Sequence, residues 1–124
     1  MADHGKLTYE VVGAAMRVHN SLGPGLREKP YENALFMELT ETGIPVSQQK
    51  AYPILHRGKP VGDCIPDLTV NGELLVEVKS VERLGESEVA QILNYLRISK
   101  LELGIIVNFK GQRLEVERLV RSRG

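Results

Sequence analysis

Asp67, Glu77 and Lys79 are the residues whose types and spacing could do chemistry in this sequence. Asp67 follows a proline, and the other two residues come soon afterwards, beyond an Asn-Gly pair. Two carboxylates, together with water or phosphate oxygens, suit Mg²⁺, a hard cation that favours octahedral oxygen coordination. The backbone carbonyl of Val78 can add another oxygen. These residues therefore predict a divalent-metal site with Asp67, Glu77 and Val78 as ligands.

Such a site would act on a phosphodiester bond. A bound metal lowers the pKa of its water and neutralises charge that develops on the phosphate. Lys79 is two residues from Glu77, so in a strand both side chains point to the same side. Lys79 could then orient or deprotonate the water, or stabilise the transition state. A Glu-x-Lys pair is also common on solvent-exposed strands, and the residue types alone leave both interpretations open.

The connection between the two strands decides whether these side chains meet. A two-residue Asn-Gly turn would place Asp67 and Glu77 on opposite faces of the sheet. A three-residue loop of residues 70–72, with Gly72 left-handed as a bulge, brings Asp67 opposite Leu75 and makes Glu77 its diagonal neighbour. We therefore predict the three-residue loop. Carboxylates on opposite faces would exclude an active site.

Hydrophobic periodicity predicts the elements that position this hairpin. Helices are expected over residues 7–22, 31–42 and 87–100. Strands are expected over residues 45–56, 61–70, 73–80, 103–109 and 114–120, with 103–109 buried on both sides. The basic tail, residues 121–124, is expected to fray. This order, α, α, β, β, β, α, β, β, predicts an α/β sheet with helices packed on it.

The start of the second helix is ambiguous. Pro30 is comfortable only in a first turn. A start at Pro30 leaves Glu28 just before the helix, whereas an earlier start puts Glu28 and Tyr31 on one face. An acid near a helix N-terminus is often a capping or dipole residue. A structural and a functional role for Glu28 both stay open at this point.

Composition favours one ordinary globular domain over residues 1–124. Hydrophobic residues make up 42% and charged residues 26% of the chain, which argues against disorder. No apolar run approaches the roughly 20 residues that span a bilayer, and the first residues carry no apolar export signal. The single cysteine, Cys64, excludes an internal disulfide and an all-cysteine metal site. We expect a cytoplasmic protein without a membrane partner.

The net charge limits how the chain could bind nucleic acid. Basic and acidic residues number 16 each, so the formal net charge is zero. This balance counts against a protein that coats nucleic acid through global charge, although a local basic rim remains compatible with it. Binding to a phosphate backbone is expected to be weak at physiological salt unless a homodimer or a protein partner adds charge.

Three motifs resemble those of the PD-(D/E)XK nuclease superfamily. Pro66-Asp67 followed by Glu77-Val78-Lys79 resembles the motif that names the superfamily. The segment 91–95, QILNY, matches the QxxxY helix motif of RecB-like and Cas4-like branches. The segment 25–31, GLREKPY, resembles the signature of the small GxxExxY family within the superfamily. The resemblance runs from about residue 7 to residue 120.

The resemblance implies a restriction-endonuclease-like αβββαβ core, a central mixed sheet flanked by helices. It also implies a Mg²⁺-dependent phosphodiester hydrolase, with Mn²⁺ as a substitute. Asp67 and Glu77 would be metal ligands, and Lys79 would be the catalytic lysine.

Three further residues receive roles from the same resemblance. Glu28 would supply an additional acidic group, and Gln91 and Tyr95 would position the phosphate or the lysine. Pro30 departs from the family pattern because it lies inside the GxxExxY segment. The single Cys64 excludes the iron–sulfur cluster of Cas4-like nucleases.

Three functions follow as hypotheses. The first is a metal-dependent nuclease that acts on DNA. The second is a non-catalytic nucleic-acid-binding or protein-binding module of the same fold, acting with a partner. The third is an unrelated structural domain whose Glu-Lys pairs are surface residues. The presence of each polar residue of the motif favours the first.

Overall fold

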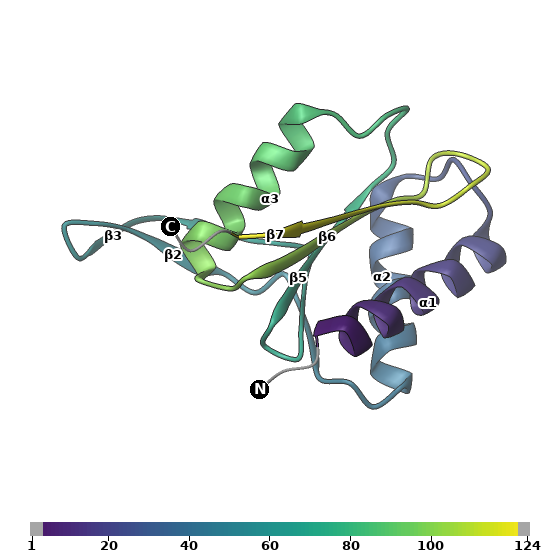
Figure 1. Ribbon diagram of the computed structural model, residues 1–124, viewed down its shortest axis with the longest axis horizontal. Helices are drawn as coiled ribbons and strands as arrows, with labels where there is room; N and C mark the ends of the chain where they lie inside the picture. The colour runs from purple at the N-terminus through teal and green to yellow at the C-terminus, as the bar shows by residue number, and fades with distance from the viewer. Residues whose placement is uncertain (1–3, 122–124) are drawn as a thin grey trace.

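The structure is a computed structural model that describes residues 4–121, so the predicted frayed tail lies almost wholly outside it. Along the chain it contains α1 (His4–Leu22), α2 (Glu28–Glu41), β1 (Val46–Gln48), β2 (Tyr52–His56), β3 (Lys59–Cys64), β4 (Leu68–Val70), β5 (Leu74–Lys79), α3 (Glu86–Ser99), β6 (Leu103–Asn108) and β7 (Glu115–Val120) (Figure 1). Within these residues, no helix is long and apolar enough to cross a membrane.

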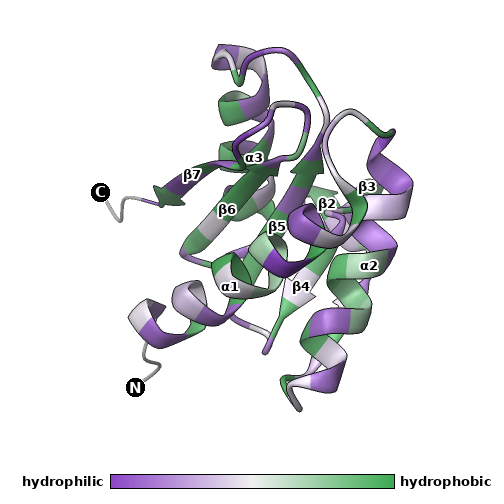
Figure 2. Cartoon of the chain, turned by 90° about the vertical axis from the view of Figure 1, so that its right-hand side faces the viewer, coloured by the Kyte–Doolittle hydropathy of each residue, from purple (hydrophilic) through white to green (hydrophobic). Residues whose placement is uncertain are grey.

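A five-stranded mixed sheet, ordered β1-β4-β5-β6-β7, forms the centre of the molecule. β5 and β6 are parallel and the other neighbours are antiparallel. Helices α1 and α2 cover one face and bury the main core against it, whereas α3 packs on the other face (Figures 1 and 2). Strand β6 is buried along its whole length, as its apolar sequence predicts. The expected α/β class with a mixed central sheet is confirmed.

Two of the predicted strands are not continuous: each is divided into two shorter strands. The expected strand 45–56 forms β1 and β2, separated where Gln49 adopts a left-handed φ of 58°. The expected strand 61–70 forms β3 and β4, separated at Pro66, which has no N–H to donate to a ladder. Strands β2 and β3 pair only with each other, as a separate two-stranded sheet. Both strands of a two-stranded sheet are edge strands, which is the position in a sheet that a proline such as Pro53 can occupy.

The β4–β5 turn brings the carboxylates to one face, by a register different from the predicted one. Val70 pairs with Leu74, so the three connecting residues are 71–73 and not 70–72. Extending this register by one residue beyond β4 puts Asp67 opposite Glu77, whereas Leu75 was predicted. Gly72 is left-handed, with φ 66°, as expected, and Asn71 is left-handed too, with φ 55°. Asn tolerates this conformation better than most residues.

Helix α2 begins earlier than Pro30. Its first residue is Glu28, so Pro30 is in the first turn, where a missing N–H costs nothing. Tyr31 stacks on Phe109 with ring centroids 4.3 Å apart, and its hydroxyl accepts from the Leu26 N–H and donates to the Gly23 carbonyl. These contacts anchor the loop before α2 to the end of β6.

Candidate active site

The Asp67 and Glu77 carboxylates interlock with each other's backbone. The Asp67 N–H donates to Glu77 Oε1 at 2.9 Å, and the Val78 N–H donates to Asp67 Oδ2 at 2.8 Å. Asp67 comes just before β4, and Glu77 lies in the middle strand β5 with only 5% of the residue exposed. The carboxylates share a face because the register pairs them directly. The condition that would have excluded an active site is therefore not met.

This carboxylate pair is electrostatically unfavourable when both members are ionised. Burial raises the pKa of Asp67, and the charge of Glu32 adds to this effect. Burial also raises the pKa of Glu77, and the neighbouring Asp67 charge raises it further. Lys79 opposes both shifts but does not cancel them. A pair of acids held close together in a partly buried place favours a bound proton or a cation.

Lys79 is held between the carboxylates and helix α3. Its Nζ is 4.0 Å from Glu77 Oε2 and donates to Gln91 Oε1 at 2.7 Å. Gln91 Nε2 in turn donates to the Tyr95 hydroxyl at 3.1 Å. Gln91 and Tyr95 are one helical turn apart on α3, so they present one face to the sheet. The structure thus brings five of the six predicted side chains into one connected group.

Glu28 is the predicted side chain that stays outside this group. It is exposed at the start of α2, and its Oε2 accepts from the Ser80 N–H at 3.2 Å. Ser80 directly follows Lys79, so Glu28 lies near the end of β5. The structure records no hydrogen bond or ion pair between Glu28 and Asp67, Glu77 or Lys79.

Glu32, one turn after Glu28 on α2, is a buried acid that the sequence analysis missed. Its residue is 4% exposed. It accepts from Gln48 Nε2 at 2.7 Å and from Gln49 Nε2 at 2.9 Å, and the same Gln49 group lies 3.3 Å from Asp67 Oδ1. Glu32 thus connects to the site through Gln49. Its i, i+4 spacing from Glu28 was the available signal.

A family model described as the PD-(D/E)XK nuclease superfamily matches residues 5–119. The chain belongs to this superfamily. The finer assignment to the GxxExxY family stays a prediction. No curated protein matches this PD-(D/E)XK chain.

Solved structures with the same fold share little sequence with this PD-(D/E)XK chain. An alkaline exonuclease, LHK-Exo, from Laribacter hongkongensis has a TM-score of 0.56 and 15% identity, covering 76% of this chain and 55% of its own. Its complex with dAMP has a TM-score of 0.57 and 15% identity, with coverages of 76% and 54%. The structure of SSO0001 has a TM-score of 0.59 and 17% identity, with coverages of 75% and 49%. The chain thus spans about half the length of these proteins.

The donor set of this PD-(D/E)XK site suits a magnesium-type cation. The described residues contain no cluster of three or more His, Cys, Asp or Glu side chains arranged for a metal. Mg²⁺ usually needs only one or two carboxylates, because water and substrate phosphates complete its shell. The Val78 carbonyl points to the same side of β5 as its N–H, which binds Asp67. Asp67, Glu77 and Val78 therefore fit the predicted ligand set.

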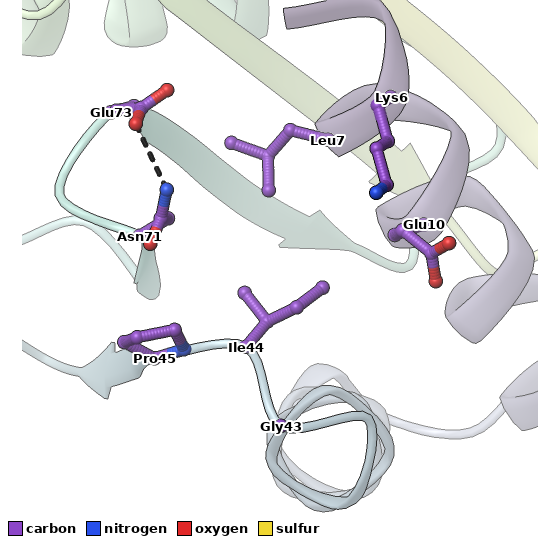
Figure 3. Close-up of a pocket in the computed structure, with 8 residues that line it drawn as sticks. All are labelled: Lys6, Leu7, Glu10, Gly43, Ile44, Pro45, Asn71 and Glu73. Atoms are coloured by element: carbon purple, nitrogen blue, oxygen red, sulfur yellow. Dashed lines mark hydrogen bonds between the residues drawn. The ribbon is translucent and has the colours of Figure 1, made fainter. Parts of the chain in front are cut away.

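A hollow at the other end of the β4–β5 hairpin lacks this chemistry. Figure 3 shows it between α1, the end of α2 and the β4–β5 turn, with Ile44 and Leu7 facing it. Asn71 and Glu73, at its rim, are hydrogen-bonded to each other at 2.9 Å. Asn71 is four strand residues from Asp67, or about 13 Å. This hollow is at the closed end of the hairpin, away from the carboxylate pair.

Proposed function

We propose that this chain is a Mg²⁺-dependent nuclease that hydrolyses phosphodiester bonds of DNA. The observation that carries the proposal is the interlocked Asp67–Glu77 pair with Lys79 Nζ 4.0 Å from Glu77 Oε2. Membership of the PD-(D/E)XK nuclease superfamily supports the reaction class. The alkaline exonuclease and its dAMP complex support DNA as the substrate, although the likeness to them lies in the fold alone.

In this proposal, Asp67, Glu77 and the Val78 carbonyl hold the cation. A bound divalent cation supplies a water of lowered pKa and neutralises charge on the phosphate. Lys79 donates from Nζ to the water or to a phosphate oxygen, which stabilises the negative charge of the transition state. Gln91 and Tyr95 are positioning residues, because Gln91 fixes Nζ and Tyr95 fixes Gln91. Glu28 and Glu32 are acids outside this centre, and Glu32 is the better connected.

The test is cleavage of labelled single-stranded and double-stranded DNA and RNA in Mg²⁺ or Mn²⁺. We expect Asp67→Asn and Lys79→Ala each to lower kcat by about 10² to 10³, the usual cost of losing one electrostatic group at a reacting centre. Arg97→Ala is the matched control, since Arg97 is exposed on α3 and bonds only to Asn94 among the recorded hydrogen bonds. The proposal fails if the wild type and both site variants behave alike on every substrate.

A non-catalytic module of the same fold is the second candidate. The observation that favours it is that the described residues provide no third acidic, cysteine or histidine ligand beside the carboxylate pair. Such a module would bind a cation or partner without turnover. It predicts that Mg²⁺ stabilises the wild type against heat while no substrate is cut.

A further inference from the structure

The β2–β3 ribbon extends away from the layered body of the molecule (Figure 1). It belongs to no larger sheet, and the residues of β3 are exposed from Lys59 to Asp63. Its tip is the turn at Arg57 and Gly58, both left-handed, with φ of 53° and 77°. A ribbon that buries so little of itself gains little from the protein core, which suggests that its surface serves another contact.

The ribbon carries a local positive charge on a chain that has none overall. Arg57 and Lys59 are basic, Lys50 lies just before the ribbon, and Asp63 is the single acid between residues 50 and 64. All four residues are exposed. The carboxylate pair of the site is acidic, so the ribbon provides the basic rim that an acidic site needs in order to hold a polyanion.

The root of the ribbon lies at the candidate active site. Tyr52 and Cys64 are paired across the ribbon, and the Tyr52 hydroxyl is hydrogen-bonded to Thr69 Oγ1 at 3.0 Å. Thr69 is two residues from Asp67 in the strand direction, so both side chains point to the same face. Cys64 is buried at the root of the ribbon, and burial, then the charges of Asp63 and Glu77, raise the pKa of its thiol.

We propose that the β2–β3 ribbon is a DNA-binding arm that holds duplex next to the active site, with Arg57 and Lys59 on backbone phosphates. This inference rests on the proposed function. Five strand steps separate Cys64 from Lys59, or about 17 Å, which corresponds to about five base pairs of duplex. The major groove of B-DNA is wide enough for a two-stranded ribbon. The arm would therefore contact DNA several base pairs from the cut.

A protein partner or a second copy of the chain is the competing occupant. Leu55 and Val61 are 58% and 63% exposed on the ribbon, and such side chains are typical of protein contacts. The excess of basic over acidic residues favours DNA, because lysine and arginine neutralise the charge of its phosphate backbone.

The experiment compares two double variants that each remove two positive charges. Arg57→Asn/Lys59→Gln alters the tip, and Asn is chosen because it tolerates the left-handed turn position. Arg113→Gln/Arg118→Gln is the control. Both control residues are exposed. Arg113 lines a hollow beside α1. Glu117 lines a hollow beside α3, and side chains alternate along a strand, so Arg118 points to the α1 face of the sheet.

Binding is measured by fluorescence anisotropy of a labelled 20-base-pair duplex, as a function of salt. Each protein also carries Asp67→Asn, so that the probe stays intact. We expect the tip variant to bind about ten-fold more weakly in about 0.1 M salt, with a slope of log K against log salt reduced by about two. The control should match the parent, and melting temperatures should agree among all three.

Each outcome decides the inference. Equal binding by the tip variant and the parent overturns it, as does equal weakening by both double variants, or no binding at all. Loss of self-association by the tip variant, with DNA binding intact, also overturns it in favour of a second copy. Arm-dependent binding without cleavage by the wild type supports the arm and refutes the nuclease. Cleavage by the wild type, together with DNA binding that the tip variant does not weaken, supports the nuclease and refutes the arm.

Discussion

At the residue scale, the carboxylate pair combines a proposed catalytic role with a structural one. Each acid accepts one backbone N–H from the segment of the other, so the pair also fixes the end of β4 against β5. Only one of the two oxygens of each carboxylate is used by these bonds. The remaining Glu77 oxygen is the one that lies near Lys79. The backbone bonds therefore leave one oxygen of each acid for side chains or a cation, and Gln49 Nε2 donates to the remaining Asp67 oxygen at 3.3 Å.

The two acids of α2 give a prediction at this scale. Glu32 is buried and connected to Asp67 through Gln49, whereas Glu28 is exposed and bonded to Ser80. We expect Glu32→Gln to lower kcat more than Glu28→Gln, by about ten-fold. Cleavage kinetics at saturating Mg²⁺ would measure this difference. A larger loss from Glu28→Gln would instead make Glu28 the functional acid, as the motif resemblance implies.

At the element scale, the contact of α3 with the sheet sets the position of Gln91. Gly104 in β6 lies directly under this helix, and a Cβ added there would be 2.8 Å from Ile92 Cδ1 and 3.3 Å from Leu96 Cδ1. Ile92 and Leu96 are fully buried, so they have little room to move. The glycine permits the close approach that lets Gln91 reach Lys79.

Gly104→Ala should therefore destabilise the fold by about 1–3 kcal/mol, the usual cost of overpacking. Urea denaturation would measure the change. Gly62→Ala is the matched control, because its added Cβ would be an ordinary 3.8 Å from Ile54 Cδ1, and little change is expected. Ile92→Val removes the crowded Cδ1, so Gly104→Ala/Ile92→Val should cost less than the sum of the two single variants. Additive costs would mean that crowding at Ile92 is not the cause.

At the scale of the whole molecule, the buried acids link stability to pH and to metal. Burial raises the pKa of Asp67 to about 6 and that of Glu77 to about 8. Unfolded carboxyls titrate near 4, so between roughly pH 4 and pH 8 the folded state binds more protons than the unfolded state. The stability that these groups contribute is present below pH 4 and is lost as pH rises through the raised pKa values.

In metal-free buffer, we expect the melting temperature of the wild type to fall from pH 5 to pH 9 more steeply than that of Glu77→Gln. Mg²⁺ or Mn²⁺ should reverse the loss, because a cation replaces the protons. At about 100 times the dissociation constant, the gain is about 2.7 kcal/mol, which corresponds to several degrees. Asp67→Asn should show no such gain. Parallel pH curves for the wild type and Glu77→Gln would contradict the linkage.

The elements with strong periodicity were predictable from the sequence, and the short ones were not. Helix α1 and strand β6 carry long uninterrupted patterns, so both were predicted, although α1 begins at His4 and not at residue 7. Strands β1 and β4 have three residues each, too few for a pattern, and their pairing depends on long-range contacts. Pro66 and Gln49 mark the breaks, but only the separate ribbon shows that the chain leaves the sheet there.

For the candidate site, the sequence by itself determined the residue types and spacing of Asp67, Glu77 and Lys79, whereas only the motif resemblance grouped Gln91 and Tyr95 with them. Spacing along one strand is local, so Glu77 and Lys79 could be placed on one side of the strand before any fold was known. The tertiary structure alone decided that Val70 pairs with Leu74, which sets the two carboxylates face to face. The tertiary structure also decided that Glu28 is bonded to Ser80 and that Glu32 is buried near the carboxylate pair. The reason is that the packing of α2 against the sheet determines which acid is buried.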